Sequence, residues 1–246
     1  MLVTWIIIFS LLGSVGSLGG AVLLLAFPDR MRSTVVPALV SYAAGTLLGA
    51  AFLGMIPQAL ERAPAAPVLA TVLAGIVIFF LLEKLVIWRH CHDGECETHN
   101  TTGPLILVGD AFHNFVDGVV IAAAFLISIP LGTATALAVI AHEVPQEVGD
   151  FAVLLDSGYP PKQAFFYNLF SSLATMPGAM IAYFYLTTMQ AAVPYILAFS
   201  AASFIYIAAA DLIPKLHRKA DLGASIQQTF LLLAGIGTIL FFRLNH

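Results

Sequence analysis

Residues 65–88 read AAPVLATVLAGIVIFFLLEKLVIW, and this stretch decides the class of fold. Residues 65–82 carry no charge, and an α-helix needs about 20 predominantly apolar residues to cross the hydrocarbon core of a bilayer. Further stretches of this kind occur along the chain, which predicts eight membrane-spanning helices. They cover residues 2–27, 36–57, 65–88, 104–128, 131–156, 160–187, 192–213 and 225–244. We therefore expect an all-α polytopic membrane protein in which residues 1–246 form a single transmembrane domain.

The composition agrees with this prediction and excludes several other classes of protein. Hydrophobic residues make up 60% of the chain and charged residues 10%, whereas a soluble domain carries about 25% charged residues. A soluble enzyme and a disordered chain are therefore excluded. Ten basic residues against 14 acidic ones leave no basic face for nucleic acid. The apolar runs are continuous, whereas a transmembrane barrel would alternate polar and apolar residues.

The basic residues predict the orientation of the chain. Of the ten, only Arg62 and Arg243 lie in the even-numbered connections or at a terminus. The odd-numbered connections hold Arg30, Arg32, Lys84, Arg89, Lys162, Lys215, Arg218 and Lys219. Because basic residues gather on the cytoplasmic side of membrane proteins, the odd-numbered connections are expected in the cytoplasm. Both termini are then extracytoplasmic, in a plasma or inner cell membrane.

Two helices end in a similar way. The second predicted helix ends Gly54-Met55-Ile56-Pro57-Gln58, and the seventh ends Asp211-Leu212-Ile213-Pro214-Lys215. These two helices run in opposite directions through the membrane, so the shared ending lies at opposite faces. Inverted repeats of this kind are common in secondary transporters. We expect a 3+2+3 arrangement, in which helices 1–3 and 6–8 form the repeat around helices 4 and 5.

The fourth and fifth helices carry polar side chains at helical spacing, and each set lies on one face. The stripe on the fourth helix consists of Asp110, His113, Asn114 and Asp117. The stripe on the fifth helix consists of His142, Glu143, Gln146, Glu147 and Asp150. Neither stripe contains a lysine or an arginine that would neutralise its acids.

Placing these acids in a membrane is costly, and a bound cation would offset the cost. One charge at the centre of a helix costs about 2.5–3.5 kcal/mol on insertion scales. The stripes hold five carboxylic acids, so their combined cost is on the order of 10 kcal/mol when all are deep and ionised. Carboxylate, imidazole and amide oxygen ligands together suit Zn²⁺, Fe²⁺, Mn²⁺ or Cd²⁺ better than Ca²⁺ or K⁺. Pro145 also frees the carbonyl of Ala141 beside His142.

His-Asn-x-x-Asp-Gly from His113 and His-Glu-x-Pro-x-Glu from His142 lie on consecutive helices of an eight-helix chain. This pair of motifs resembles the ZIP (Zrt-, Irt-like protein) divalent metal transporters, of the bacterial type without a large extracellular domain. The resemblance implies that His113, Asp117 and His142 are ligands of a first metal site. It implies that Asn114, Glu143 and Glu147 serve the same site or an adjacent second site. It also implies a homodimer and an elevator-like movement of the metal-bearing helices.

This chain departs from the family pattern at Gln146, where members with two metals often have His or Glu. An amide oxygen is an uncharged and weaker ligand. We therefore expect one high-affinity ion rather than a pair of ions.

The connection between the third and fourth helices, residues 89–103, also contains metal-ligating residue types. They are His90, Cys91, His92, Cys96 and His99. The predicted orientation places them in the cytoplasm, where thiols stay reduced. They are interpreted either as a flexible metal acceptor or sensor or as a solvated linker.

Several further polar residues are candidates for the ion pathway. They are Asp110, Asp150, Asn168, Ser171 and Asp211. Serine and asparagine are also ordinary interhelical hydrogen-bonding residues, and Asp211 is also interpreted as a hydrated helix-end residue near Lys215.

Three other functions compete with metal transport. His142-Glu143 suggests an intramembrane metal-dependent hydrolase, but the second histidine of H-E-x-x-H is Gln146 here. Acid and histidine chains also relay protons in carriers of other solutes. Nine polar residues on two helices are too many to serve only as interhelical contacts.

We expect a non-enzymatic secondary transporter that moves Zn²⁺, or else Fe²⁺, Mn²⁺ or Cd²⁺, into the cytoplasm. The ion is the substrate, no organic cofactor is expected, and the expected partners are divalent metal ions, the lipid bilayer and a second copy of the chain.

Overall fold

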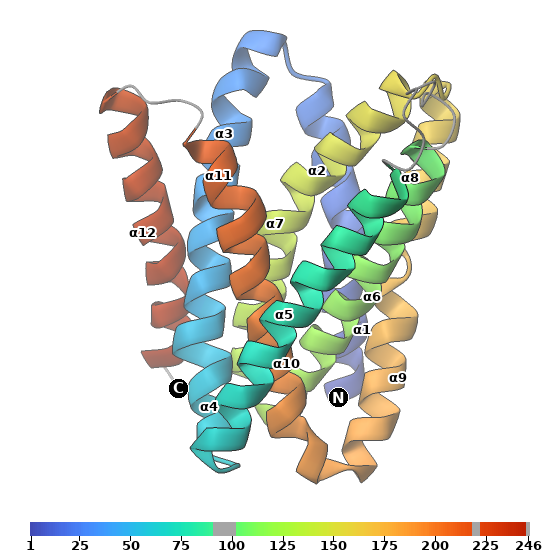
Figure 1. Cartoon of the computed structure of the whole chain (residues 1–246). Helices are drawn as coiled ribbons and strands as arrows, with labels where there is room; N and C mark the ends of the chain where they lie inside the picture. Colours follow the sequence, from blue (N-terminus) through green and yellow to red (C-terminus); the bar gives the residue numbers. More distant parts are fainter. Residues whose placement is uncertain (91–101, 218–221, 245–246) are drawn as a thin grey trace.

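The computed structural model describes residues 1–90, 102–217 and 222–244, and these residues fold into a bundle of long helices (Figure 1). The first four crossings consist of α1 (Leu2–Leu11), η1 (Leu12–Gly16) and α2 (Ser17–Leu25); α3 (Asp29–Gly49), η2 (Ala50–Met55) and α4 (Ile56–Leu60); α5 (Ala65–His90); and α6 (Thr102–Ile127). The last four consist of α7 (Ile129–Asp156); α8 (Pro161–Ser172) and α9 (Thr175–Thr188); η3 (Gln190–Ala192), α10 (Val193–Tyr206), η4 (Ile207–Leu212) and α11 (Ile213–Leu216); and α12 (Leu222–Leu244).

The expectation of an all-α polytopic membrane protein is confirmed. Within the described ranges, seven helical segments are long and apolar enough to cross a membrane. The 28-residue helix α7 is outside that set, and it carries the polar stretch from His142 to Asp150. Large apolar side chains such as Leu73, Phe230 and Phe241 are exposed on the outside of the bundle, as expected for a surface that faces lipid rather than water. The two termini lie at the same end of the bundle (Figure 1).

Prolines explain where the helices depart from the predicted boundaries. The second crossing begins at Asp29 rather than at residue 36, so Pro37 lies inside α3 and not at its edge. Its fixed φ is compatible with a helix, although it removes one backbone hydrogen bond. The sixth crossing is divided into α8 and α9, which are separated by Leu173 and Ala174. Pro177 cannot donate a hydrogen bond to the Leu173 carbonyl, which accounts for this break.

The two Ile-Pro sequences share a local structure. A π-helical segment, η2 in one half and η4 in the other, leads directly into Ile56-Pro57 and Ile213-Pro214. A proline ring clashes with the carbonyl four residues before it, and a wider turn relieves that clash. This similarity of local geometry agrees with the inverted repeat, which otherwise stays a prediction.

Close helix contacts in the bundle depend on glycines. A Cβ atom at Gly118 of α6 would lie 2.0 Å from the backbone oxygen of Thr175, and one at Gly178 of α9 would lie 2.1 Å from the oxygen of Phe115. A Cβ atom at Gly45 of α3 would similarly lie 2.0 Å from the oxygen of Leu232 in α12. Such small residues let helix backbones approach closely in membranes. The α6–α9 contact holds in place the helix that carries the first polar stripe.

Candidate metal centre

Four side chains bring one ligand atom each to a common point between two helices. They are His113 and Asp117 of α6 and His142 and Glu143 of α7. The Nε2 atoms of the two histidines lie 3.2 Å apart. Nε2 of His113 lies 3.6 Å from Oδ2 of Asp117 and 3.2 Å from Oε1 of Glu143. Nε2 of His142 lies 3.2 Å and 3.5 Å from the same two oxygens.

These separations match the size of a tetrahedral zinc site. Nitrogen and oxygen ligands lie about 2.0–2.2 Å from Zn²⁺, so neighbouring ligand atoms of a tetrahedron are about 3.3–3.6 Å apart. The five distances above range from 3.2 to 3.6 Å. Two carboxylates would also neutralise the charge of a divalent cation. The arrangement is therefore suited to a small divalent metal ion in both size and charge.

Burial and hydrogen bonding prepare the ligand atoms for a cation. The side chains of Asp117, His142 and Glu143 are fully buried. Both carboxylate oxygens of Asp117 and of Glu143 lack a hydrogen-bond donor in the described part of the chain, and such buried charges require a partner. Nδ1 of His142 lies 3.0 Å from the carbonyl oxygen of Ala138. Because a carbonyl can only accept, Nδ1 carries the proton and Nε2 presents its lone pair to the centre.

A second group of acids adjoins the first through Glu143. It consists of Asp110, Glu143 and Glu147. Oδ1 of Asp110 accepts hydrogen bonds from Asn114 at 3.0 Å and from Gln146 at 3.3 Å. The two carboxylate oxygens of Glu147 accept hydrogen bonds from Asn168 and Ser172. Most oxygens of the second group that do not belong to Glu143 are thus already engaged by protein donors.

Helix α9 contributes a residue that the sequence reasoning missed. Thr175 Oγ1 donates a hydrogen bond of 3.0 Å to Oδ1 of Asn114. Both amide atoms of Asn114 are therefore engaged, since its Nδ2 faces Asp110. Asn168, Ser172 and Thr175 follow i, i+4, i+7 spacing, so a search for polar stripes on the sixth crossing would have included Thr175.

The four-ligand cluster of His113, Asp117, His142 and Glu143 borders a cavity of about 520 Å³ between α5, α6 and η4. His113 and Gln146 line it on the side of the metal centre, and Glu83 and Asp211 line it further along. The side chain of His113 is 17% exposed, whereas that of His142 is fully buried. Tyr206 also lines this cavity and donates a hydrogen bond to Glu83. Neither residue of this pair was expected from the sequence.

The remaining candidate residues lie apart from the four-ligand cluster. Asp211 forms an ion pair of 2.7 Å with Lys215, as the helix-end interpretation predicted. Ser171 donates to the backbone oxygens of Tyr167 and Asn168. One carboxylate oxygen of Asp150 is buried without a donor in the described ranges. Cys91, His92, Cys96 and His99 fall outside the described residues, and His90 is the last residue of α5.

Comparisons with known proteins agree with this chemistry. The family model described as ZIP Zinc transporter matches residues 88–243. Zinc transporter ZIP13 of Pongo abelii is 33% identical over 98% of this chain and 79% of that protein. Zinc transporter SLC39A7 of Mus musculus is 30% identical over 84% of this chain and 62% of that protein. Zinc transporter ZIP10 of Danio rerio is 38% identical over 55% of this chain, and the match spans only 17% of that longer protein.

The family match covers more than half of the chain and includes both motif-bearing helices, α6 and α7. The similarity to ZIP13 extends over almost the whole length. The chain belongs to the ZIP zinc transporter family.

Proposed function

We propose that this protein carries Zn²⁺ across a membrane through the site formed by His113, Asp117, His142 and Glu143. One observation carries the proposal: four buried or nearly buried ligand atoms lie at tetrahedral zinc spacing on two adjacent membrane helices. Family membership supports metal-ion transport in general, since the relatives are named zinc transporters. It favours transport over the hydrolase interpretation of His142-Glu143.

The proposed stoichiometry is one high-affinity ion. Gln146, which the sequence also offered as a metal ligand, donates a hydrogen bond from its amide nitrogen to Asp110, at 3.3 Å. Glu147 is engaged by Asn168 and Ser172. These contacts leave the second group of acids with few free ligand atoms.

Gln146→His is expected to raise the stoichiometry from one bound zinc ion to two. An imidazole at this position would replace an amide donor with a nitrogen ligand beside Asp110 and Glu147. Zinc per protein, measured by elemental analysis and by isothermal titration, reports the change. Gln146→Asn keeps the amide and is the matched control, for which one ion is expected. Two ions already bound to the unmodified protein would contradict the one-ion proposal.

The proposed direction of zinc transport is from the extracytoplasmic face, which bears the two termini, to the opposite face. Eight of the ten basic residues lie in connections of the latter face, which the positive-inside rule assigns to the cytoplasm. The cavity beside His113 lies toward that face, because its lining includes Glu83 near the end of α5 and Val108 near the start of α6. Glu83 and Asp211 would act as acidic stations along the release route once an ion displaces their partners, Tyr206 and Lys215.

The proposed movement is elevator-like, with two groups of helices sliding past each other. Glycine contacts join α6 to α9, and α2 to α7 through Gly20 and Val144. Other glycine contacts join α3 to α12, and α5 to α10 through Gly75 and Ala202. Between the two groups, the close glycine contact is that of Gly54 with Leu131. The close glycine contacts within each group favour its movement as a unit, which must slide along the contact between α3 and α7. The homodimer and the metal-binding role of residues 89–103 stay predictions.

Transport is tested with purified protein in lipid vesicles that contain a fluorescent zinc chelator. Saturable zinc entry without ATP is expected. Glu143→Gln keeps the shape of a side chain whose carboxylate has no donor in the described residues, and it should reduce entry to the rate of protein-free vesicles. Equal, non-saturable entry in all three preparations would refute the proposed function.

A further inference from the structure

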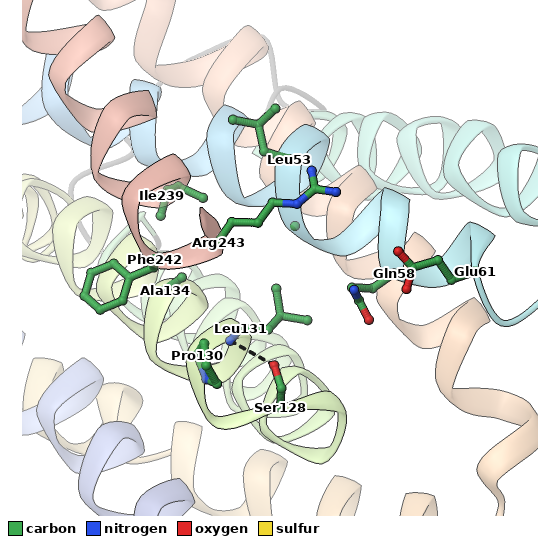
Figure 2. A pocket seen from close by; sticks show the side chains of 11 residues that line it. Leu53, Gln58, Glu61, Ser128, Pro130, Leu131, Ala134, Ile239, Phe242 and Arg243 are labelled. Carbon is green, nitrogen blue, oxygen red and sulfur yellow. Dashed lines mark hydrogen bonds between the residues drawn. The ribbon is translucent and has the colours of Figure 1, made fainter. Parts of the chain in front are cut away.

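A cavity of about 490 Å³ lies at the end of the bundle that bears the termini, between η2, α4, the start of α7 and the end of α12. Figure 2 shows Leu131 extending from α7 into the space before the helix that carries Gln58. A Cβ atom at Gly54 of η2 would lie 2.9 Å from Cδ1 of Leu131. This contact lies at the inner end of the cavity, because Gln58 and Glu61 line it nearer the end of the same crossing.

Thr135 lies on α7 between this termini-side cavity and the metal centre. It follows Leu131 by four residues and precedes His142 by seven, so the three side chains share one face of the helix. Along the helix axis, Thr135 is about 6 Å from Leu131 and about 10 Å from His142. Its neighbour Ala134 lines the cavity. An ion that moves along this face from the cavity to the metal centre must pass Thr135.

The hydroxyl of Thr135 is buried without a partner. Its side chain is fully buried, and Oγ1 forms no hydrogen bond with any residue that the structure describes. Helical hydroxyls can donate to a carbonyl three or four residues earlier, as those of Ser41 and Thr46 do here. Ser10 and Ser203 also lack a partner among these residues, but they lie on neither of the helices that carry the metal ligands. A buried hydroxyl left unpaired is costly, so the one on the ligand-bearing helix is suited to a partner that is present only in transit.

We propose that Thr135 is an entry residue for the transported zinc ion, and that its hydroxyl contacts the ion and its remaining water between the termini-side cavity and the metal centre. This inference rests on the proposed transport function. A hydroxyl suits a transient contact, because it donates to and accepts from water and its oxygen is an uncharged ligand. Groups along a conduction path must bind weakly enough to release the ion. The carboxylates of Asp117 and Glu143 then receive it.

The contact between Leu131 and Gly54 separates Thr135 from the cavity in this structure. Leu131 belongs to the group of helices that carries the metal ligands, and Gly54 belongs to the other group. The proposed elevator movement therefore changes this contact. Sliding of α7 along η2 opens it and brings Thr135 to the cavity, where water solvates the hydroxyl.

The first test is zinc uptake into vesicles that contain a fluorescent zinc chelator. Thr135→Val replaces the hydroxyl with a methyl group of similar size, and it should slow uptake at sub-saturating zinc by about tenfold, the effect of losing one hydrogen bond to a charged group. Uptake at saturating zinc should change little. The equilibrium zinc affinity, measured by chelator competition, should stay unchanged because the four ligands are intact. Thr135→Ser keeps the hydroxyl and should retain uptake.

Two further results separate this role from a structural one. The melting temperature of Thr135→Val should be unchanged or higher, since the substitution removes a buried hydroxyl that has no partner among the described residues. Thr133→Val is the matched control, because Thr133 lies on the opposite face of α7 and lines a separate hollow beside Phe242; it should leave uptake unchanged. An equal loss of uptake at low and at saturating zinc would show an altered helix movement and overturn the proposal.

The second test asks whether an external route reaches residue 135. In a Cys91→Ser/Cys96→Ser background, Thr135→Cys should react with a small cationic, membrane-impermeant thiol reagent added outside intact cells, and zinc should slow the reaction. Ala136→Cys is the control, because Ala136 is also fully buried but lies about 100° further around α7. No reaction at either position, or equal reaction at both, would overturn the proposal.

Failure of this inference is distinct from failure of the proposed function. Saturable uptake that is the same in Thr135→Val and in the unmodified protein would overturn the entry role and leave zinc transport standing. Absence of saturable uptake in the unmodified protein would refute zinc transport itself.

Discussion

His142→Ala is expected to abolish zinc transport and to weaken zinc binding by at least about 100-fold. The variant removes one of four ligand atoms, and His142 is fully buried between Asp117 and Glu143. Its loss leaves two buried carboxylates with a single imidazole to complete the site. Competition with a chelator of known affinity measures the binding change, and uptake into vesicles measures the loss of transport.

Two further variants make this expectation specific. His217→Ala removes an exposed histidine beyond α11 and should leave binding and transport unchanged. Asp117→Asn keeps the size of a side chain that accepts no hydrogen bond from the described residues, and it should also lose zinc binding. If both site variants bound zinc as the unmodified protein does, the ligands would have to lie elsewhere.

Gly118→Ala is expected to destabilise the protein by at least about 3 kcal/mol. The added Cβ would lie 2.0 Å from the backbone oxygen of Thr175 and 2.7 Å from the backbone nitrogen of Ala179. Backbone atoms of a helix cannot move aside singly, so α6 and α9 must separate. Zinc binding should fall as well, because α6 carries His113 and Asp117. Thermal unfolding in detergent measures the loss of stability.

Gly109→Ala is the control for this prediction, because it makes the same substitution in the same helix. A Cβ atom there meets nothing within 4 Å, and alanine is a better helix former than glycine. An unchanged or slightly higher melting temperature is expected. Equal melting temperatures of Gly118→Ala and Gly109→Ala would show that the α6–α9 contact is not tight in the protein.

Much of the architecture could be predicted because it depends on the composition of each segment and on the helical periodicity of its polar side chains. Apolar runs of bilayer length identify helices, and i, i+3, i+4, i+7 spacing places Asp110, His113 and Asp117 on one face of α6.

The break between α8 and α9 was missed because Pro177 acts on the carbonyl of Leu173, four residues earlier, and the residues at the break itself carry no helix-breaking side chain. The predicted second helix began next to Pro37 because proline usually marks a helix end. In the structure the loss of one backbone hydrogen bond at Pro37 does not end α3, which begins at Asp29.

The details of the metal centre depend on how α6 and α7 approach each other, which spacing along one helix does not determine. Glu143 follows His142 by one residue and lies at the other edge of the same polar face of α7, and the approach of α6 brings both side chains to His113. The family resemblance therefore did not decide whether Glu143 serves the first metal site or an adjacent second site, because that depends on how closely α6 approaches α7. The orientation of the Gln146 amide depends likewise on Asp110, which lies on the other helix.

The spacing of the four ligand atoms also bears on the divalent cations that are most abundant around cells. Ca²⁺ binds six to eight oxygens at about 2.3–2.6 Å, so it would need the helices to spread and would still lack ligands. Mg²⁺ fits by radius, but it requires six ligands in octahedral geometry and gives up its water reluctantly. In the proposed site, ligand atoms 3.2–3.6 Å apart on helices joined by close packing would discriminate by ionic size and by coordination number. We therefore expect the proposed site to bind a scarce ion that accepts four ligands in the presence of a large excess of ions that do not.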